Sequence, residues 1–220
     1  MGYGLNIIND NKQIIIDSNY KNYFLFEENT ISFTNNNTLS SYYQAFNNQY
    51  LTPPIVSFKN NTSVSVGVSS YVKSGNYYVG MYVFCQVKAT ANFSYRVYNL
   101  KKSVSVDQFG LRIFDNNSNI IYDSGAKPLV IRQQIDVSIG TSSSTVTHSN
   151  YDNAYYIVSS VGFGAVGRGN PQGPLYFFKI GIQKLSNTQV IVGYIMHTVK
   201  VTNFTDSIFS TNSCSLLICE

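Results

Sequence analysis

The sequence predicts an all-β fold of the antiparallel β-sandwich type, built from two similar modules that arose by internal duplication. Two observations predict this fold. Many short apolar or alternating segments are separated by turns rich in Asn, Gly, Ser and Pro, which is typical of sandwiches and barrels. In addition, a fifteen-residue stretch occurs twice. Residues 4–18 read GLNIINDNKQIIIDS and residues 110–124 read GLRIFDNNSNIIYDS, with eight of fifteen positions identical.

The repeated stretch predicts a β-hairpin. In the second copy Leu111 and Ile113 alternate with Arg112, the polar run 115–119 supplies a turn, and 120–122 forms the return strand. We expect the glycines to allow a tight start or a close approach of the backbone. We expect the aspartates to accept hydrogen bonds from nearby amides. The shared motif residues are Gly4, Leu5, Asp17 and Ser18 in the first copy, and Gly110, Leu111, Asp123 and Ser124 in the second.

The repeat extends beyond the hairpins. Lys21 and Lys127 have the same spacing of 106 residues, as do the strand-like segments 31–33 and 137–139. The sequence therefore predicts an N-terminal β module at 1–106 and a C-terminal β module at 107–220. Two arrangements remain open: two tandem sandwiches, or one sandwich built from two interleaved halves.

Further strands and one helix are expected along the chain. The segment 39–50, LSSYYQAFNNQY, could form a short helix. The tyrosine pairs 42–43, 77–78 and 155–156 are each expected to place one ring in the core and the other toward solvent or a neighbour. The other predicted strands are 54–58, 63–68, 77–87, 93–98, 103–106, 154–158, 175–182, 190–195 and 198–201.

Composition limits the classes of function. Only 12% of the residues are charged and 44% are apolar, a balance common in β-rich proteins that pack against other proteins, although an AT-rich genome would also contribute. The net charge of +4 is spread out, so we expect no nucleic-acid partner. No apolar run approaches the length of a membrane span, and the start lacks a signal peptide. We therefore expect no membrane insertion.

The sequence offers few groups for catalysis. His148 and His197 have no metal-binding spacing around them, and no nucleophile motif or phosphate loop is present. Asp10 and the run 115–117 resemble calcium loops only loosely. We predict no catalytic residue, no metal and no cofactor, and hence no enzyme. The three cysteines are expected to be free thiols, with a Cys214–Cys219 disulfide as the alternative.

One glycine-rich segment, 162–174, has the sequence GFGAVGRGNPQGP. It is either a long connection between strands or an exposed loop that contacts a partner or a glycan. In the second case the contact residues are Gly167, Arg168, Gly169, Asn170 and Gln172.

The hairpin motif also carries a family likeness. The start Met-Gly-Tyr-Gly-Leu, the run FGLRIFD at 109–115 with IYDSG at 121–125 and KPL at 127–129, and the run FSYRVY at 93–98 resemble small β-rich proteins encoded among the tail genes of tailed bacteriophages. The hairpin loops here carry Asn and Lys where that family often has Gly. The C-terminal half, with its glycine-rich segment, does not match the pattern.

The resemblance implies a non-enzymatic component of a phage tail: a fibre, an adaptor or a tail-tip subunit. Its partners would be other tail proteins in a symmetric homo-oligomer, together with a host surface glycan or protein. It would be made in the host cytoplasm and located in the virion. The alternatives are a distal receptor-binding protein that recognises a host surface glycan, a polysaccharide-degrading enzyme and a bacterial surface adhesin.

Overall fold

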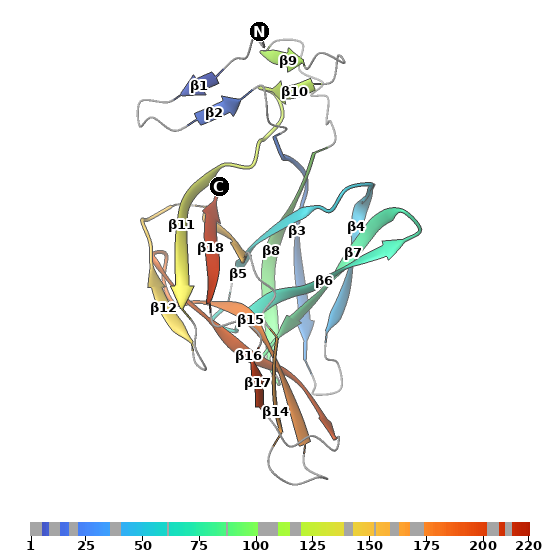
Figure 1. The fold of residues 1–220 in the computed structure, drawn as a ribbon, viewed down its shortest axis with the longest axis vertical. Helices are drawn as coiled ribbons and strands as arrows, with labels where there is room; N and C mark the ends of the chain where they lie inside the picture. The colour runs from blue at the N-terminus through green and yellow to red at the C-terminus, as the bar shows by residue number, and fades with distance from the viewer. Residues whose placement is uncertain are drawn as a thin grey trace.

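The computed structural model confirms the predicted all-β fold. Every regular element within the described residues is a β-strand, and two large antiparallel sheets face each other as a sandwich (Figure 1). The structure describes residues 6–8, 14–17, 22–35, 41–60, 62–86, 88–100, 110–114, 120–138, 143–151, 153–158, 163–167, 174–201, 207–209 and 213–220.

The first sheet has six strands in the order β11-β18-β13-β5-β8-β3. Three of these come from the first half of the chain and three from the second. Their bounds are β3 (Phe24–Thr34), β5 (Ile55–Asn60), β8 (Thr90–Asn99), β11 (Ile131–Ser138), β13 (Tyr155–Val158) and β18 (Ser213–Cys219).

The second sheet has eight strands. Six follow the order β12-β16-β15-β6-β7-β4, while β14 pairs with both β15 and β17. The strands are β4 (Tyr42–Tyr50), β6 (Val66–Ser74), β7 (Tyr77–Cys85), β12 (Ser144–Thr147), β14 (Phe163–Gly167), β15 (Pro174–Lys184), β16 (Gln189–Val201) and β17 (Ser207–Phe209).

The two copies of the repeat form two hairpins with the same pairing. The first joins β1 (Asn6–Ile8) to β2 (Ile14–Asp17), and the second joins β9 (Arg112–Phe114) to β10 (Ile120–Asp123). In both, the register shifts at the same place, leaving Ile15 unpaired in one ladder and Ile121 in the other, 106 residues apart. Both hairpins lie at one end of the molecule (Figure 1).

The same spacing governs the strands that follow. The ladder of β3 with β8 shifts register between Leu25 and Glu27, and that of β11 with β18 shifts between Ile131 and Gln133. The chain crosses itself just before these bulges, where the Leu129 amide donates to the Tyr23 carbonyl at 2.7 Å. Tyr23 and Leu129 are also 106 residues apart, so this contact joins equivalent positions of the two repeats, as expected for halves related by a pseudo-two-fold axis.

The first half thus contributes three strands to each sheet, whereas the second half contributes three strands to the first sheet and five to the second. The halves lie side by side, and both sheets run continuously across the seam between them, through the pairs β5–β13 and β6–β15. The predicted boundary between residues 106 and 107 lies outside the described residues.

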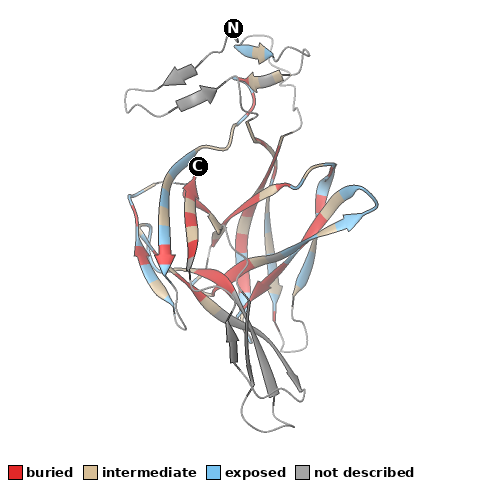
Figure 2. Cartoon of the chain, viewed as in Figure 1, coloured by how far each residue is buried: buried red, intermediate tan, exposed pale blue. Residues whose placement is uncertain are grey.

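The core lies between the two sheets (Figure 2). Alternate residues of each strand point inward, as the pleat of a strand requires. On β8, for example, Ala91, Phe93, Tyr95 and Val97 are buried in the core. Each large apolar side chain that is fully buried stabilises the fold by about 1.5–3 kcal/mol. The largest ones are Tyr95, Tyr98, Phe84, Phe93, Met81, Ile182, Leu216 and Ile218.

The helix expected at 39–50 is wrong. Residues 42–50 form strand β4, which pairs with β7 at the edge of the second sheet. The Tyr43 ring lies over Gly80 of β7, and a Cβ added at Gly80 would lie 2.6 Å from the Gln44 carbonyl oxygen. This close cross-strand packing outweighs the weak helical pattern of the segment, as tertiary context commonly does.

Other strand predictions differ in detail. The two strands expected at 190–195 and 198–201 form one strand, β16, and the strand expected at 63–68 begins at Val66. The strand expected at 103–106 lies outside the described residues. The expectation of one buried and one exposed ring per tyrosine pair is wrong for two of the three pairs. Tyr42 and Tyr43 are both exposed, and Tyr155 and Tyr156 are both buried although they point to opposite faces of β13.

Candidate functional site

The glycine-rich segment begins with a strand. Residues 163–167 form β14, which pairs with β15 on one side and with β17 on the other. Gly167, one of the predicted contact residues, is paired with Leu175 in this ladder. The others, Arg168, Gly169, Asn170 and Gln172, lie outside the described residues, so their contact with a partner stays a prediction.

The motif residues of the second hairpin are held by one another. The Asp123 carboxylate is buried; it accepts from the Gly125 amide at 3.0 Å and pairs with Arg112 Nε at 3.1 Å. The Ser124 hydroxyl oxygen accepts from the Leu111 amide at 2.9 Å. A Cβ at Gly110, where φ is +156°, would lie 2.5 Å from that hydroxyl oxygen. The expected close approach and turn-closing carboxylate are both present.

In the first hairpin the backbones of Asn6 and Asp17 pair in the same way as those of Arg112 and Asp123. Gly4, Leu5 and Ser18 lie outside the described residues.

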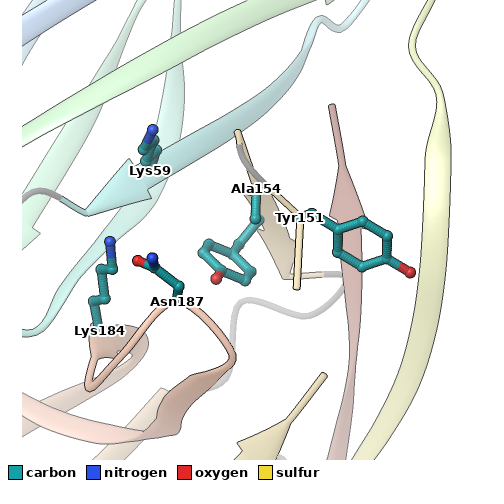
Figure 3. Close-up of a pocket in the computed structure, with 6 residues that line it drawn as sticks. Lys59, Tyr151, Ala154, Lys184 and Asn187 are labelled. Atoms are coloured by element: carbon teal, nitrogen blue, oxygen red, sulfur yellow. The ribbon is translucent and has the colours of Figure 1, made fainter. Parts of the chain in front are cut away.

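A pocket of about 90 Å³ opens where the two sheets meet near the seam (Figure 3). Lys59 comes from the end of β5 in the first half of the chain. Lys184 is the last residue of β15, and Asn187 lies in the turn between β15 and β16. Tyr151 and Ala154, before β13, and Tyr156, within it, form the remaining wall. Only the joined halves therefore form this pocket. The lining residues are Lys59, Tyr151, Ala154, Tyr156, Lys184 and Asn187.

The pocket is cationic. Its described lining includes two lysines and no carboxylate, and among the described residues neither lysine forms an ion pair, the three ion pairs present being elsewhere. The Lys59 ammonium donates to the Asn153 side-chain oxygen at 3.2 Å, which holds it at the rim without neutralising it. Figure 3 shows Lys184, at the end of β15, and Asn187, in the turn that follows, on the side of the pocket opposite β13.

A buried histidine supports the tyrosine wall of the pocket. His148 Nδ1 lies 2.7 Å from the Ser149 carbonyl, which can only accept, so Nδ1 carries the proton. In the neutral ring Nε2 then accepts from the Tyr156 hydroxyl at 2.9 Å. Burial raises the pKa of Tyr156 to about 12, so this phenol stays neutral. The Tyr151 ring stacks parallel to His148. His148 is thus a positioning group.

A second polar cluster crosses the seam on the outer face of the first sheet. The Arg96 guanidinium lies 4.0 Å over the Tyr155 ring, and its Nε lies 3.2 Å from Glu28 Oε1. The Tyr155 hydroxyl donates to the same Glu28 oxygen at 2.7 Å. Burial and the bond to Glu28 raise the pKa of Tyr155. The cluster joins β3 and β8 of the first half to β13 of the second.

The cysteines are free. Cys214 lies in the core, whereas Cys219 lies on the other face of β18 with its thiol near the Tyr155 carbonyl. Five residues of extended strand separate them by roughly 17 Å, which is far beyond the reach of a disulfide. Burial raises the pKa of the Cys219 thiol to about 12, so it is not a nucleophile at neutral pH.

No group of three or more His, Cys, Asp or Glu side chains that could hold a metal occurs in the part of the chain that the structure describes. Within the same residues there is no helix long and apolar enough to cross a membrane.

The pocket residues were not expected from the sequence. Lys59 and Lys184 are 125 positions apart, and their strands, β5 and β15, belong to different sheets that come together only in the folded sandwich. The one available signal was the polar turn at 185–188, which precedes the alternating residues of β16. Comparisons of the chain with protein-family models, curated proteins and solved structures find no match.

Proposed function

We propose that the chain is a non-enzymatic structural component of a bacteriophage tail that acts by assembling with other tail proteins. One observation carries this proposal. The hairpin that carries the resemblance is built twice, with the same pairing and the same bulge, and both copies lie at one end of the molecule (Figure 1). The two halves keep a similar sequence only in the hairpins and in the first strands that follow them. The later parts of each half have diverged.

Two equal hairpins at one end suit a symmetric tail. A chain with internal two-fold symmetry can present two equivalent surfaces to neighbouring subunits, in quasi-equivalent places. The exposed apolar side chains Leu111 and Phe114 of the second hairpin are 48% and 54% exposed, which is the character expected of a contact surface rather than a solvated turn. Fibre, adaptor and tip subunits would all use such a surface.

The proposal is tested by immunogold electron microscopy on particles purified from the lysate, with an antibody to this chain. Gold on tails is expected. Gold near the tail trunk would indicate an adaptor, and gold at the distal end would indicate a fibre or tip subunit. Antigen that remains in the soluble fraction, with unlabelled particles, would contradict the proposal.

A distal receptor-binding protein that recognises a host surface glycan is the second candidate. The cationic pocket favours it, because a concave polar site with aromatic and amide groups suits a sugar. Preincubation of host cells with the purified chain should then reduce phage adsorption, whereas Lys184→Gln protein should compete less well. Equal competition by both proteins would leave the pocket without a role in attachment.

A further inference from the structure

We propose that the pocket formed by Lys59, Lys184 and Asn187 binds the carboxylate of an acidic sugar residue, such as a uronic acid in a polysaccharide. The inference uses the proposed function only in choosing a sugar as the carrier of the carboxylate. Virion location and ligand binding are separate measurements, so either can fail without the other.

The charge of the pocket determines the sign of the ligand. Two lysines line one small pocket, and within the described residues no carboxylate pairs with either of them. Among the acidic residues that the structure describes, none lines this site. Like charges held in one concave site attract an anion more strongly than either lysine does alone.

The size of the pocket restricts the ligand to one charged group and the few atoms that carry it. A space of about 90 Å³ holds several water molecules, since one water needs roughly 10–15 Å³ by this measure. A carboxylate with part of a sugar ring fits, but an oligosaccharide would extend outward over the rim. The pocket is open on one side, so such an extension is sterically allowed.

The rest of the lining favours a sugar over a free inorganic anion. The Asn187 side-chain amide can both donate to and accept from hydroxyl groups. The Tyr156 ring is fixed by its hydroxyl bond to His148 and by its place in the core. A rigid aromatic wall beside an amide provides an apolar surface for C–H groups and a partner for hydroxyls. A free phosphate or sulfate could accept a hydrogen bond from the amide but has no C–H groups to place against the aromatic ring.

The direct test is a titration of the full-length ¹⁵N-labelled chain, followed by amide shifts in two-dimensional NMR spectra. The probes are methyl β-D-glucuronide, the neutral methyl β-D-glucoside, and inorganic sulfate. We expect the glucuronide to shift the amides of Lys59, Ala154, Tyr156 and Asn187, with a dissociation constant on the order of millimolar. Raising the salt concentration should weaken this binding because the lysines are solvent-accessible.

Three variants identify the site. Lys184→Gln should weaken glucuronide binding about tenfold, which corresponds to about 1.4 kcal/mol. Lys184→Arg keeps the charge and should retain most of the affinity. Lys73→Gln, near the end of β6 where Lys73 lies over the Tyr78 ring, removes one positive charge elsewhere and should leave binding unchanged. Unchanged spectra away from the pocket show that each variant is folded.

Three outcomes would overturn the inference. Equal shifts with the neutral glucoside would remove the role of the carboxylate. Sulfate that binds as tightly as the glucuronide would show a general anion site without sugar recognition. Glucuronide shifts that persist unchanged in Lys184→Gln, or no shifts at tens of millimolar probe, would place the ligand elsewhere or nowhere.

Discussion

Two neighbouring carboxylates on β3 have opposite environments. Glu27 lies at the bulge and is only 6% exposed; it accepts from the Asn47 amide at 2.7 Å and the Tyr50 hydroxyl at 3.2 Å. Burial outweighs these bonds and raises the pKa of Glu27. At Glu28 burial also raises the pKa, but the Tyr155 hydroxyl and Arg96 outweigh it, and the net pKa is lowered. Ionisation of Glu27 therefore destabilises the folded state, whereas ionisation of the adjacent Glu28 stabilises it.

Substitution of these two residues should reveal those signs. The folded state holds the Glu27 proton more tightly than the unfolded chain does, so its contribution to stability is present at low pH and is lost as the pH rises through the folded pKa. Glu27→Gln should therefore gain stability relative to the native chain between about pH 4 and pH 7. Urea unfolding at intervals of one pH unit measures this difference.

Glu28→Gln is the matched control. The lowered pKa of Glu28 means that its ionised form stabilises the fold above the unfolded pKa and loses this effect as the pH falls through the folded pKa. The deficit of Glu28→Gln should thus be largest near neutral pH and shrink below about pH 4. The same pH trend in both variants would contradict the two environments.

Arg96 should depend on its shape as well as its charge. The guanidinium stacks on Tyr155 and pairs with Glu28 while its side chain is only 15% exposed. A lysine keeps the charge but loses the planar stack, so Arg96→Lys should cost about 1–2 kcal/mol in the free energy of unfolding. Arg132→Lys, at the exposed pair with Glu220, should change it by less than about 0.5 kcal/mol. Equal effects would show that the seam cluster adds nothing beyond surface pairing.

At the scale of elements, the second hairpin depends on one carboxylate. Asp123→Ala would leave the Gly125 amide and Arg112 without this acceptor, and we expect a local loss of about 1–3 kcal/mol. Amide hydrogen exchange at Ser124, which donates to the Leu111 carbonyl at 2.9 Å, reports the opening of the hairpin. Asp123→Asn retains an oxygen that can accept from the Gly125 amide, so the Ser124 amide should exchange more slowly in this variant than in Asp123→Ala. Unchanged exchange in the alanine variant would mean that the ladder alone holds the hairpin.

The hairpins and most strands could be predicted because their information is local. A strand with a period of two followed by a turn rich in Asn and Asp can be recognised within about ten residues, and the spacing of the repeat extends the prediction to the second copy. The strand β4 could not be predicted, because its conformation depends on packing against Gly80 and pairing with β7. The pocket could not be predicted either, since Lys59 and Lys184 meet only through sheet topology.

At the scale of the whole molecule, the pairing of the two halves at the seam completes both sheets. Each sheet crosses from one half to the other through a single residue pair, Phe58 with Tyr156 in the first sheet and Val66 with Ile182 in the second. All four side chains are buried. An isolated half would expose two strand edges, β5 and β6 in the first half, beside apolar side chains. Such edges pair readily with another chain.

The fragment 1–106 should therefore form a homodimer across these edges rather than a stable monomer. Because the seam is pseudo-two-fold, a second copy of the first half can take the place of the second half with the same antiparallel pairing. Light scattering coupled to size-exclusion chromatography measures the mass. Val66→Lys places a charge at the seam, where Val66 is fully buried, and should yield monomers or unfolded chain. A folded, monomeric native fragment at tens of micromolar would show instead that each module is complete alone, and that the duplication joined two self-sufficient domains.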